Sequence, residues 1–212
     1  MKLGIPYINC LSNSLEDLTD TMESLRYHPI ENSPWGAATP CPSVRFKMAH
    51  GNHFVFLVYD VWENETLGRF SEHNKPVYRD SCVEFFIRFK NEQNYYNLEF
   101  NCLGACLAGW GPNRNNRKLL APEIISQIKS YTKISRKNND KMPLIHWQLT
   151  LKIPVTVFVH SNVHQLLRQK ATANFYKCGD ELSQPHYMSW NNIKTSAPDF
   201  HQPRFFREIE FL

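Results

Sequence analysis

Two stretches of the sequence decide its fold: SCVEFFIRF at residues 81–89 and YYNLEFNC at residues 95–102. Both alternate apolar and polar side chains with the period of two that is typical of β-strands. Only the short polar segment 90–94 joins them. We therefore predict that the two stretches form an antiparallel β-hairpin.

The alternation sorts the side chains of this hairpin onto two faces. If Phe89 pairs with Tyr96, one face is apolar and is expected to point into the core, with Val83, Phe85, Ile87, Phe89, Tyr96, Leu98 and Phe100. The other face is polar and carries Glu84, Arg88, Glu99 and Asn101. Such a face suits the hydroxyl groups of a sugar. For the hairpin taken alone, an ordinary solvated sheet face, with a cross-strand pair between Arg88 and Glu99, is the default explanation of this pattern.

Further strands are predicted on both sides of the hairpin. Alternating or continuous apolar patterns occur at residues 43–49, 53–61, 146–153, 171–176 and 207–211. Only residues 14–25 show helical spacing, with Ser14 as the expected N-cap. We predict an all-β fold, a jelly-roll-like antiparallel β-sandwich with a short N-terminal helix and long loops. Residues 1–43 are interpreted as an N-terminal extension that packs on the sandwich formed by 44–212.

Composition and charge exclude several classes of protein. Hydrophobic residues make up 42% of the chain and charged residues 21%, which is enough to build a core. The net charge is +4, and its densest basic stretches, 114–118 and 133–141, are rich in Asn and are interpreted as solvated loops. We therefore expect no nucleic-acid partner. No apolar run is long enough for a membrane span, and residues 1–10 do not form a signal peptide, so we expect a cytoplasmic protein or the processed form of an exported one.

The chain contains 6 cysteines, at positions 10, 41, 82, 102, 106 and 178. They form no C-x-x-C pair and have no histidines at zinc-finger spacing, so structural zinc is not expected. Their even number permits disulfides, but their spacing requires none. The sequence thus indicates no required cofactor.

Three segments, taken together, resemble carbohydrate-binding module family 9. They are PVYRDSCVEFF at 76–86, YYNLEFNCLGA at 95–105, and a tail over 173–211 that ends in PDFHQPRFFREIEF. The resemblance extends from about residue 44 to the end of the chain. It implies a non-catalytic sandwich that holds a sugar ring between two aromatic side chains, while polar residues of neighbouring strands bind the hydroxyls. The expected partner is a mono-, oligo- or polysaccharide.

The resemblance also implies roles for individual residues. Tyr78 and Phe200 match the two aromatic walls, Glu84 the acid that binds sugar hydroxyls, and Asn101 a polar residue of the adjoining strand. The departures are that the family's best-known clamp uses two tryptophans, and that Glu99 stands where the family has a basic residue. We include Glu99 among the expected sugar-binding residues.

Calcium is a second implication of the resemblance, because family members carry it as a structural ion. Calcium requires several oxygen ligands. The candidate carboxylates Asp60, Asp80 and Asp180 are isolated in the sequence. No ligand set can be matched.

Trp110 and His201 lie near the segments of the resemblance. Trp110 belongs to GACLAGWGPNRNN, which we interpret as a loop rich in Gly and Asn. It is included among the expected carbohydrate-binding residues, although a loop tryptophan can also fill the end of a sandwich. His201 follows the proposed wall at Phe200 and is expected to face solvent.

Two other functions remain open. A glycoside hydrolase would use Glu84 and Glu99 as its pair of carboxyls. We expect Arg88 to lower both of their pKa values, which disfavours a general acid. A haem- or partner-binding sandwich would need axial ligands, and Met48, Met188 and His186 are scattered candidates.

Overall fold

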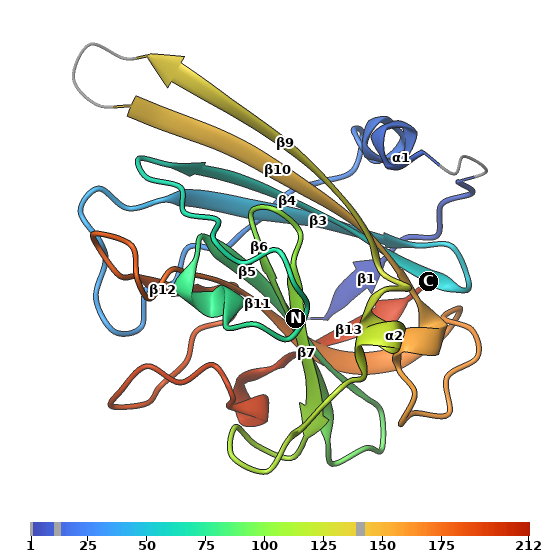
Figure 1. Ribbon diagram of the computed structural model, residues 1–212. Helices are drawn as coiled ribbons and strands as arrows, with labels where there is room; N and C mark the ends of the chain where they lie inside the picture. The colour runs from blue at the N-terminus through green and yellow to red at the C-terminus, as the bar shows by residue number, and fades with distance from the viewer. Residues whose placement is uncertain (1, 11–13, 139–142) are drawn as a thin grey trace.

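The computed structural model describes residues 2–10, 14–138 and 143–212, and it shows the predicted β-sandwich. Two sheets form two layers (Figure 1). The first has the order β1–β13–β11–β5–β6–β7–β8, with β12 paired to β11. Its strands are β1 (Leu3–Ile5), β5 (Cys82–Phe89), β6 (Tyr95–Asn101), β7 (Cys106–Gly111), β8 (Lys118–Leu119), β11 (Lys170–Cys178), β12 (Tyr187–Ser189) and β13 (Arg207–Phe211). All of its pairs are antiparallel except β1 with β13.

The second sheet is entirely antiparallel and has the order β2–β3–β4–β10–β9. Its strands are β2 (His28–Pro29), β3 (Ser43–His50), β4 (Phe54–Glu63), β9 (Lys129–Asn138) and β10 (Pro143–Pro154). The α-helices are α1 (Leu15–Thr21) and α2 (Pro122–Ile125), and the 3-10 turns are η1 (Val77–Arg79), η2 (Val155–Val157) and η3 (Pro203–Phe205). Within the described residues, no helix has the length and apolarity that crossing a membrane would require.

The predicted hairpin is β5 and β6, and its apolar face is the centre of the core. All seven apolar side chains assigned to that face are buried there. The register differs from the expected one, because Ile87 rather than Phe89 lies opposite Tyr96. A shift of two residues leaves every side chain on its predicted face. Rings meet across the two sheets: Phe175 of β11 stacks on Phe46 of β3, with 3.7 Å between centroids.

The first 43 residues contribute a strand to each sheet, β1 to the first and β2 to the second. Between them, α1 begins at the predicted cap, since the Ser14 hydroxyl accepts hydrogen bonds from the backbone of Glu16 and Asp17. Leu18 and Met22 then pack against Phe56 on the outside of the second sheet. Figure 1 shows α1 lying against that layer.

Two strands lie where loops were predicted. β9 covers 133–138 of the basic stretch 133–141, and the remaining 139–141 lie outside the described residues. It is the edge strand beside β10, and side chains 133–137 are exposed. Lysines on an edge strand discourage pairing with other chains. This strand is therefore as rich in charged residues as a solvated loop, which is why a loop was predicted. β7 contains Trp110, which we had assigned to a loop.

The outer face of the first sheet is covered rather than solvated, which contradicts the solvated polar surface considered for the hairpin. A second apolar cluster packs on it from the long segments before β5 and after β11. Its buried members include Val77, Phe86, Tyr95, Leu107, Tyr176, Ile193, Phe200 and Phe206. Figure 1 shows the segment between β12 and β13 on the side of this sheet away from the second layer. Glu84, Glu99 and Asn101 are consequently buried.

Candidate functional site

An open pocket of about 400 Å³ lies where this outer cover is incomplete. Its floor is formed by Glu84 of β5, Glu99 of β6 and Cys178 of β11, which lie side by side on three adjacent strands. The walls come from η1, β12 and the neighbouring loops: Tyr78, Arg114, Asn115, Arg117, Asp180, Tyr187, Pro198, Asp199, Phe200 and His201. We call this site the acidic pocket, after the carboxyl groups at its floor and rim.

Four of the six residues predicted for sugar binding line this pocket: Tyr78, Glu84, Glu99 and Phe200. The Cα register of the hairpin places Glu84 directly opposite Glu99. Tyr78 is half-buried, and its carbonyl accepts a hydrogen bond from the backbone of Asp180 at 3.1 Å. Segments more than 100 positions apart in the sequence are thus joined at one site.

Asn101 and Trp110 lie elsewhere. The Asn101 amide donates to Asp80 at 2.9 Å and to the carbonyl of Phe70 at 2.7 Å, so it organises the loop before β5. Trp110 pairs with Tyr96 across β6 and β7, and its side chain packs against the core. Its ring lies 4.3 Å from that of His160. Both residues are therefore absent from the lining of the acidic pocket.

Burial controls the ionisation of the two floor carboxyls. Glu84 is 3% exposed, and burial, reinforced by Cys178 and Glu99, raises its pKa well above the ordinary value. Burial also raises the pKa of Glu99, to about 7, although Arg117 and a hydrogen bond from Asn97 oppose the shift. The expectation that Arg88 lowers both pKa values was wrong, because that side chain hydrogen-bonds Thr172 at 3.3 Å on the next strand.

The cation that accompanies the acidic floor comes from a loop instead. Arg117 lies 3.8 Å from Glu99, and Arg114 also lines the pocket. Both belong to the basic stretch 114–118, which was predicted to be solvated. Its Asn residues indicated a loop, which covers 114–117 before β8 begins, but nothing in the sequence indicated that this loop folds back over β6.

His201 is largely buried, which contradicts its expected solvent exposure. Its ring contacts the Tyr95 hydroxyl at 2.7 Å and the Arg117 guanidinium. Burial, with Arg117 and Arg114 nearby, lowers the pKa of His201 far below its ordinary value. A neutral ring that accepts a hydrogen bond from Arg117 at Nε2 carries its own proton on Nδ1, facing Tyr95. His201 thereby fixes Arg117 at the rim of the pocket.

Two tyrosine rings hold the side chain of Phe200 in place. Its ring stacks on Tyr176 at 4.2 Å and 12° between planes, and the Tyr176 hydroxyl donates to the Phe200 carbonyl at 3.1 Å. Tyr187 meets the same ring edge-on at 6.1 Å. Phe200 is only 8% exposed, so it offers the pocket a small part of its ring. Tyr187, which the sequence analysis did not single out, is half-buried and adds a third aromatic to the lining.

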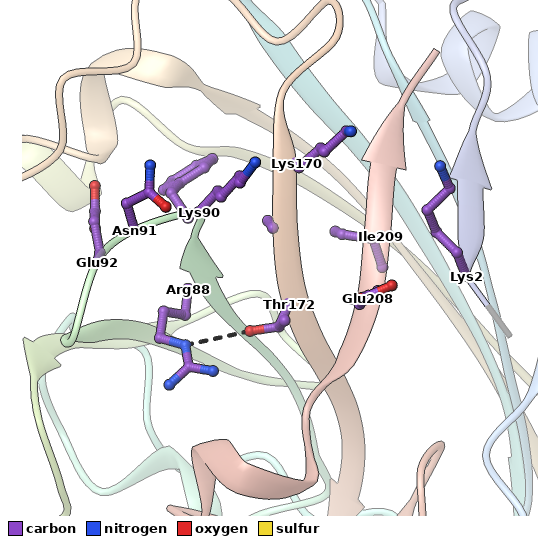
Figure 2. A pocket seen from close by; sticks show the side chains of 11 residues that line it. Lys2, Arg88, Lys90, Asn91, Glu92, Lys170, Thr172, Glu208 and Ile209 are labelled. Atoms are coloured by element: carbon purple, nitrogen blue, oxygen red, sulfur yellow. Dashed lines mark hydrogen bonds between the residues drawn. The ribbon is translucent and has the colours of Figure 1, made fainter.

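A second hollow, of about 440 Å³, lies along the opposite end of β5 and β11. It is lined by Lys2, Arg88, Phe89, Lys90, Asn91, Glu92, Lys170, Ala171, Thr172, Glu208 and Ile209, and we call it the cationic groove. In Figure 2, Arg88 points toward Thr172, and Lys90 and Lys170 lie above this pair in the view. Its one aromatic, Phe89, is 3% exposed and packs in the core. The groove therefore lacks a flat apolar face for a sugar.

The predicted calcium carboxylates are dispersed. Asp80 accepts hydrogen bonds from the backbone of Arg69 and Phe70 and from Asn101. Asp60 pairs with Arg45 and His146 on the second sheet. Asp180, the third candidate, lines the acidic pocket, so the three carboxylates lie at three separate places.

The candidate haem ligands are separate. Met48 and Met188 are both buried in the core. His186 contacts the amino group of Lys177 at 2.9 Å. None of the three side chains lines the acidic pocket.

Comparison with known protein families covers nearly the whole chain. The family model of carbohydrate-binding family 9 matches residues 13–211. The chain belongs to this family. Family 9 domains are non-catalytic binding modules, so the hydrolase alternative is not favoured. No curated protein matches the chain.

Solved structures share the fold of this family 9 domain. A proposed carbohydrate-binding protein from Bacteroides uniformis ATCC 8492 is 29% identical, with a TM-score of 0.91 over 100% of this chain and 99% of that one. A family 9 module from Caldicellulosiruptor kristjanssonii in complex with glucose is 13% identical, with a TM-score of 0.60 and coverage of 100% and 96%. One from the same organism in complex with cellotriose is 13% identical, with a TM-score of 0.55 and coverage of 100% and 93%.

Proposed function

We propose that the acidic pocket binds a sugar ring, with Tyr78 and Phe200 as its aromatic walls and Glu84 and Glu99 as hydrogen-bonding partners. The observation that carries this proposal is the meeting of two buried carboxyls, two arginines and three aromatic rings in one open pocket. Ligand sites combine an apolar lining with a few fixed polar groups in this way. The pocket volume suits one or two sugar units.

The floor can match the mixed hydrogen bonding of sugar hydroxyls. Burial that raises the pKa of a carboxyl favours its protonated form, which both donates and accepts hydrogen bonds. Glu84 is such a group, while the Arg117 guanidinium only donates. A sugar hydroxyl, which is itself donor and acceptor, can therefore be bound by this floor without an unpaired partner.

The aromatic lining favours weak binding. A sugar ring has an apolar C–H face that gains roughly 25 cal/mol per Å² when it is removed from water against an aromatic ring. Tyr78 and Tyr187 are half-buried and Phe200 shows little of its ring, so the stacked area is small. After the cost of association, we expect dissociation constants in the micromolar to millimolar range.

The complexes of the Caldicellulosiruptor modules guide the choice of ligand. Those modules were solved with glucose and with cellotriose. We propose neutral hexoses and their short oligomers as the ligand class for this chain. Glucose and cellotriose are the first compounds to test.

The test is a glycan array followed by calorimetry with any sugar that binds. Tyr78→Ala and Phe200→Leu are expected to weaken binding by about 5–10-fold each, because each removes stacking worth roughly 1 kcal/mol. Tyr7→Ala is the matched control, since Tyr7 is 49% exposed and does not line the pocket. If both pocket variants bind as tightly as wild type, Tyr78 and Phe200 are not the walls.

A further inference from the structure

Two cysteines lie beside Glu84 at the floor of the acidic pocket. Cys82 of β5 is the direct Cα partner of Cys178 on β11, and Glu84 follows two positions later on the same face of β5. One ligand atom from each residue lies within 4.8 Å of both others, and all three side chains are buried. In the part of the chain that the structure describes, no other three His, Cys, Asp or Glu side chains converge in this way.

We infer that Cys82, Glu84 and Cys178 form a binding site for a thiophilic divalent cation such as Zn²⁺. Zinc prefers sulfur, nitrogen and carboxylate donors in a tetrahedron, with Zn–S bonds of about 2.3 Å. That geometry separates two sulfur ligands by roughly 3.8 Å. The three ligand atoms already lie within 4.8 Å of one another. Side-chain rotation can therefore bring the two sulfurs to the separation that zinc requires.

The surroundings suit a metal with one open coordination position. The three donors come from two adjacent strands of one sheet, so the backbone holds them in place. Glu84 and Cys178 also line the acidic pocket, which gives the ion a route of entry and room for water as a fourth ligand. Arg114 and Arg117 line the same pocket and offset the excess negative charge of two thiolates and a carboxylate.

In the metal-free site, a thiol hydrogen bond links Cys178 to Glu84. The Cys178 thiol donates to a Glu84 oxygen at 3.2 Å. Burial raises the pKa of Cys82 to about 12, and contact with Cys82, together with burial, raises that of Cys178. A divalent cation would replace these protons. Thiolate ligands select a soft or borderline ion, so this site is distinct from any calcium site.

The test is a titration of the full chain with Cd²⁺ under reducing conditions. A Cys10→Ser/Cys41→Ser background removes the two least buried thiols, which bind Cd²⁺ nonspecifically. We expect one Cd²⁺ per chain with thiolate-to-cadmium charge-transfer absorption, and a cadmium NMR shift typical of two sulfur ligands. Zn²⁺ is expected to displace the Cd²⁺.

Variants locate the site. Cys82→Ser and Cys178→Ser are each expected to weaken Cd²⁺ binding by about 100-fold or more, because even outer-shell changes cost about 10–100-fold. Cys102→Ser is the matched control: it is buried, and its Sγ donates to the Leu67 carbonyl at 3.4 Å, a bond that a serine can keep. Absorption that persists without Cys82 and Cys178, or no absorption in the background protein, overturns the proposal.

The cation site shares Glu84 with the proposed sugar site, but the two proposals are tested separately. The titration contains no sugar, and its readout comes from thiolates that the sugar proposal does not use. Because a metal at Glu84 would occupy a proposed sugar partner, sugar binding should be measured after treatment with a chelator. Failure of one proposal then leaves the other intact.

Discussion

The acidic pocket and the cationic groove are similar in volume, about 400 and 440 Å³, and both involve β5 and β11. They differ in where their charged groups lie. Glu84 and Glu99 are 3% and 2% exposed at the floor of the pocket. The amino groups of the groove belong to exposed residues such as Lys90 and Lys170.

This difference shows that volume alone does not identify a binding site. Exposed lysines remain solvated and cost little free energy. Buried carboxyls lose their hydration, which is costly unless other groups compensate. At Glu99 the compensation comes from Asn97 at 2.9 Å and Arg117, side chains on two different segments. Of the two hollows, only the acidic pocket has fully buried carboxyls among its described lining residues.

The largest expected effect follows from removing a carboxyl at the floor of the acidic pocket. Glu84→Ala should weaken sugar binding by about 10–100-fold, because a hydrogen bond to a charged or buried partner contributes roughly 1.5–3 kcal/mol. Isothermal calorimetry would measure it, with circular dichroism as a check of folding. Glu208→Ala, an exposed glutamate of the cationic groove, is the matched control and should bind like wild type. Equal binding by a folded Glu84→Ala variant would remove the floor from the proposed site.

The second effect concerns stability, because the pKa of Glu99 is raised from 4.5 to about 7. Below pH 4.5 the carboxyl is protonated in the folded and unfolded states. As pH rises toward 7, the unfolded state ionises first, so the stability that Glu99 contributes falls and is lost above the folded pKa. Glu99→Gln cannot ionise. Its free energy of unfolding should therefore rise relative to wild type with increasing pH, by on the order of 1–3 kcal/mol.

Urea unfolding of both proteins at about pH 5 and about pH 8 would measure this difference. Glu208→Gln serves as the comparison from the exposed groove and should follow wild type at both values. A Glu99→Gln variant whose stability relative to wild type is independent of pH would show that Glu99 is ionised throughout.

Much of the fold could be predicted because the alternation of apolar and polar residues in the hairpin indicates both the strands and their core-facing side. The alternation in 81–89 and 95–102 placed all seven named apolar side chains of the hairpin in the core, even though the register was displaced by two residues. A displacement by an even number preserves the faces. β9 was missed because an edge strand keeps charged side chains in water on both faces, so its pattern lacks the apolar alternation.

The site was harder to predict than the fold. The family resemblance brought Tyr78, Glu84 and Phe200 together, and the alternation of the hairpin placed Glu99 beside Glu84. Arg117 and His201 were assigned to solvent. Whether a polar side chain of a loop is buried depends on the long-range packing of that loop. Nothing in the local sequence records such packing. For the same reason, the pairing of Cys82 with Cys178 became visible only through the order of β5 and β11.

The smallest effect is expected in the cationic groove. Lys90→Ala/Lys170→Ala should leave sugar affinity within about two-fold of wild type and change the free energy of unfolding by less than about 0.5 kcal/mol, as is usual for exposed side chains. Both lysines are exposed and lie away from the acidic pocket. Calorimetry and urea unfolding, run beside Glu84→Ala, would test both values. If this variant lost affinity as strongly as Glu84→Ala, the sugar would contact the groove as well, and burial of charge would fail to distinguish the two hollows.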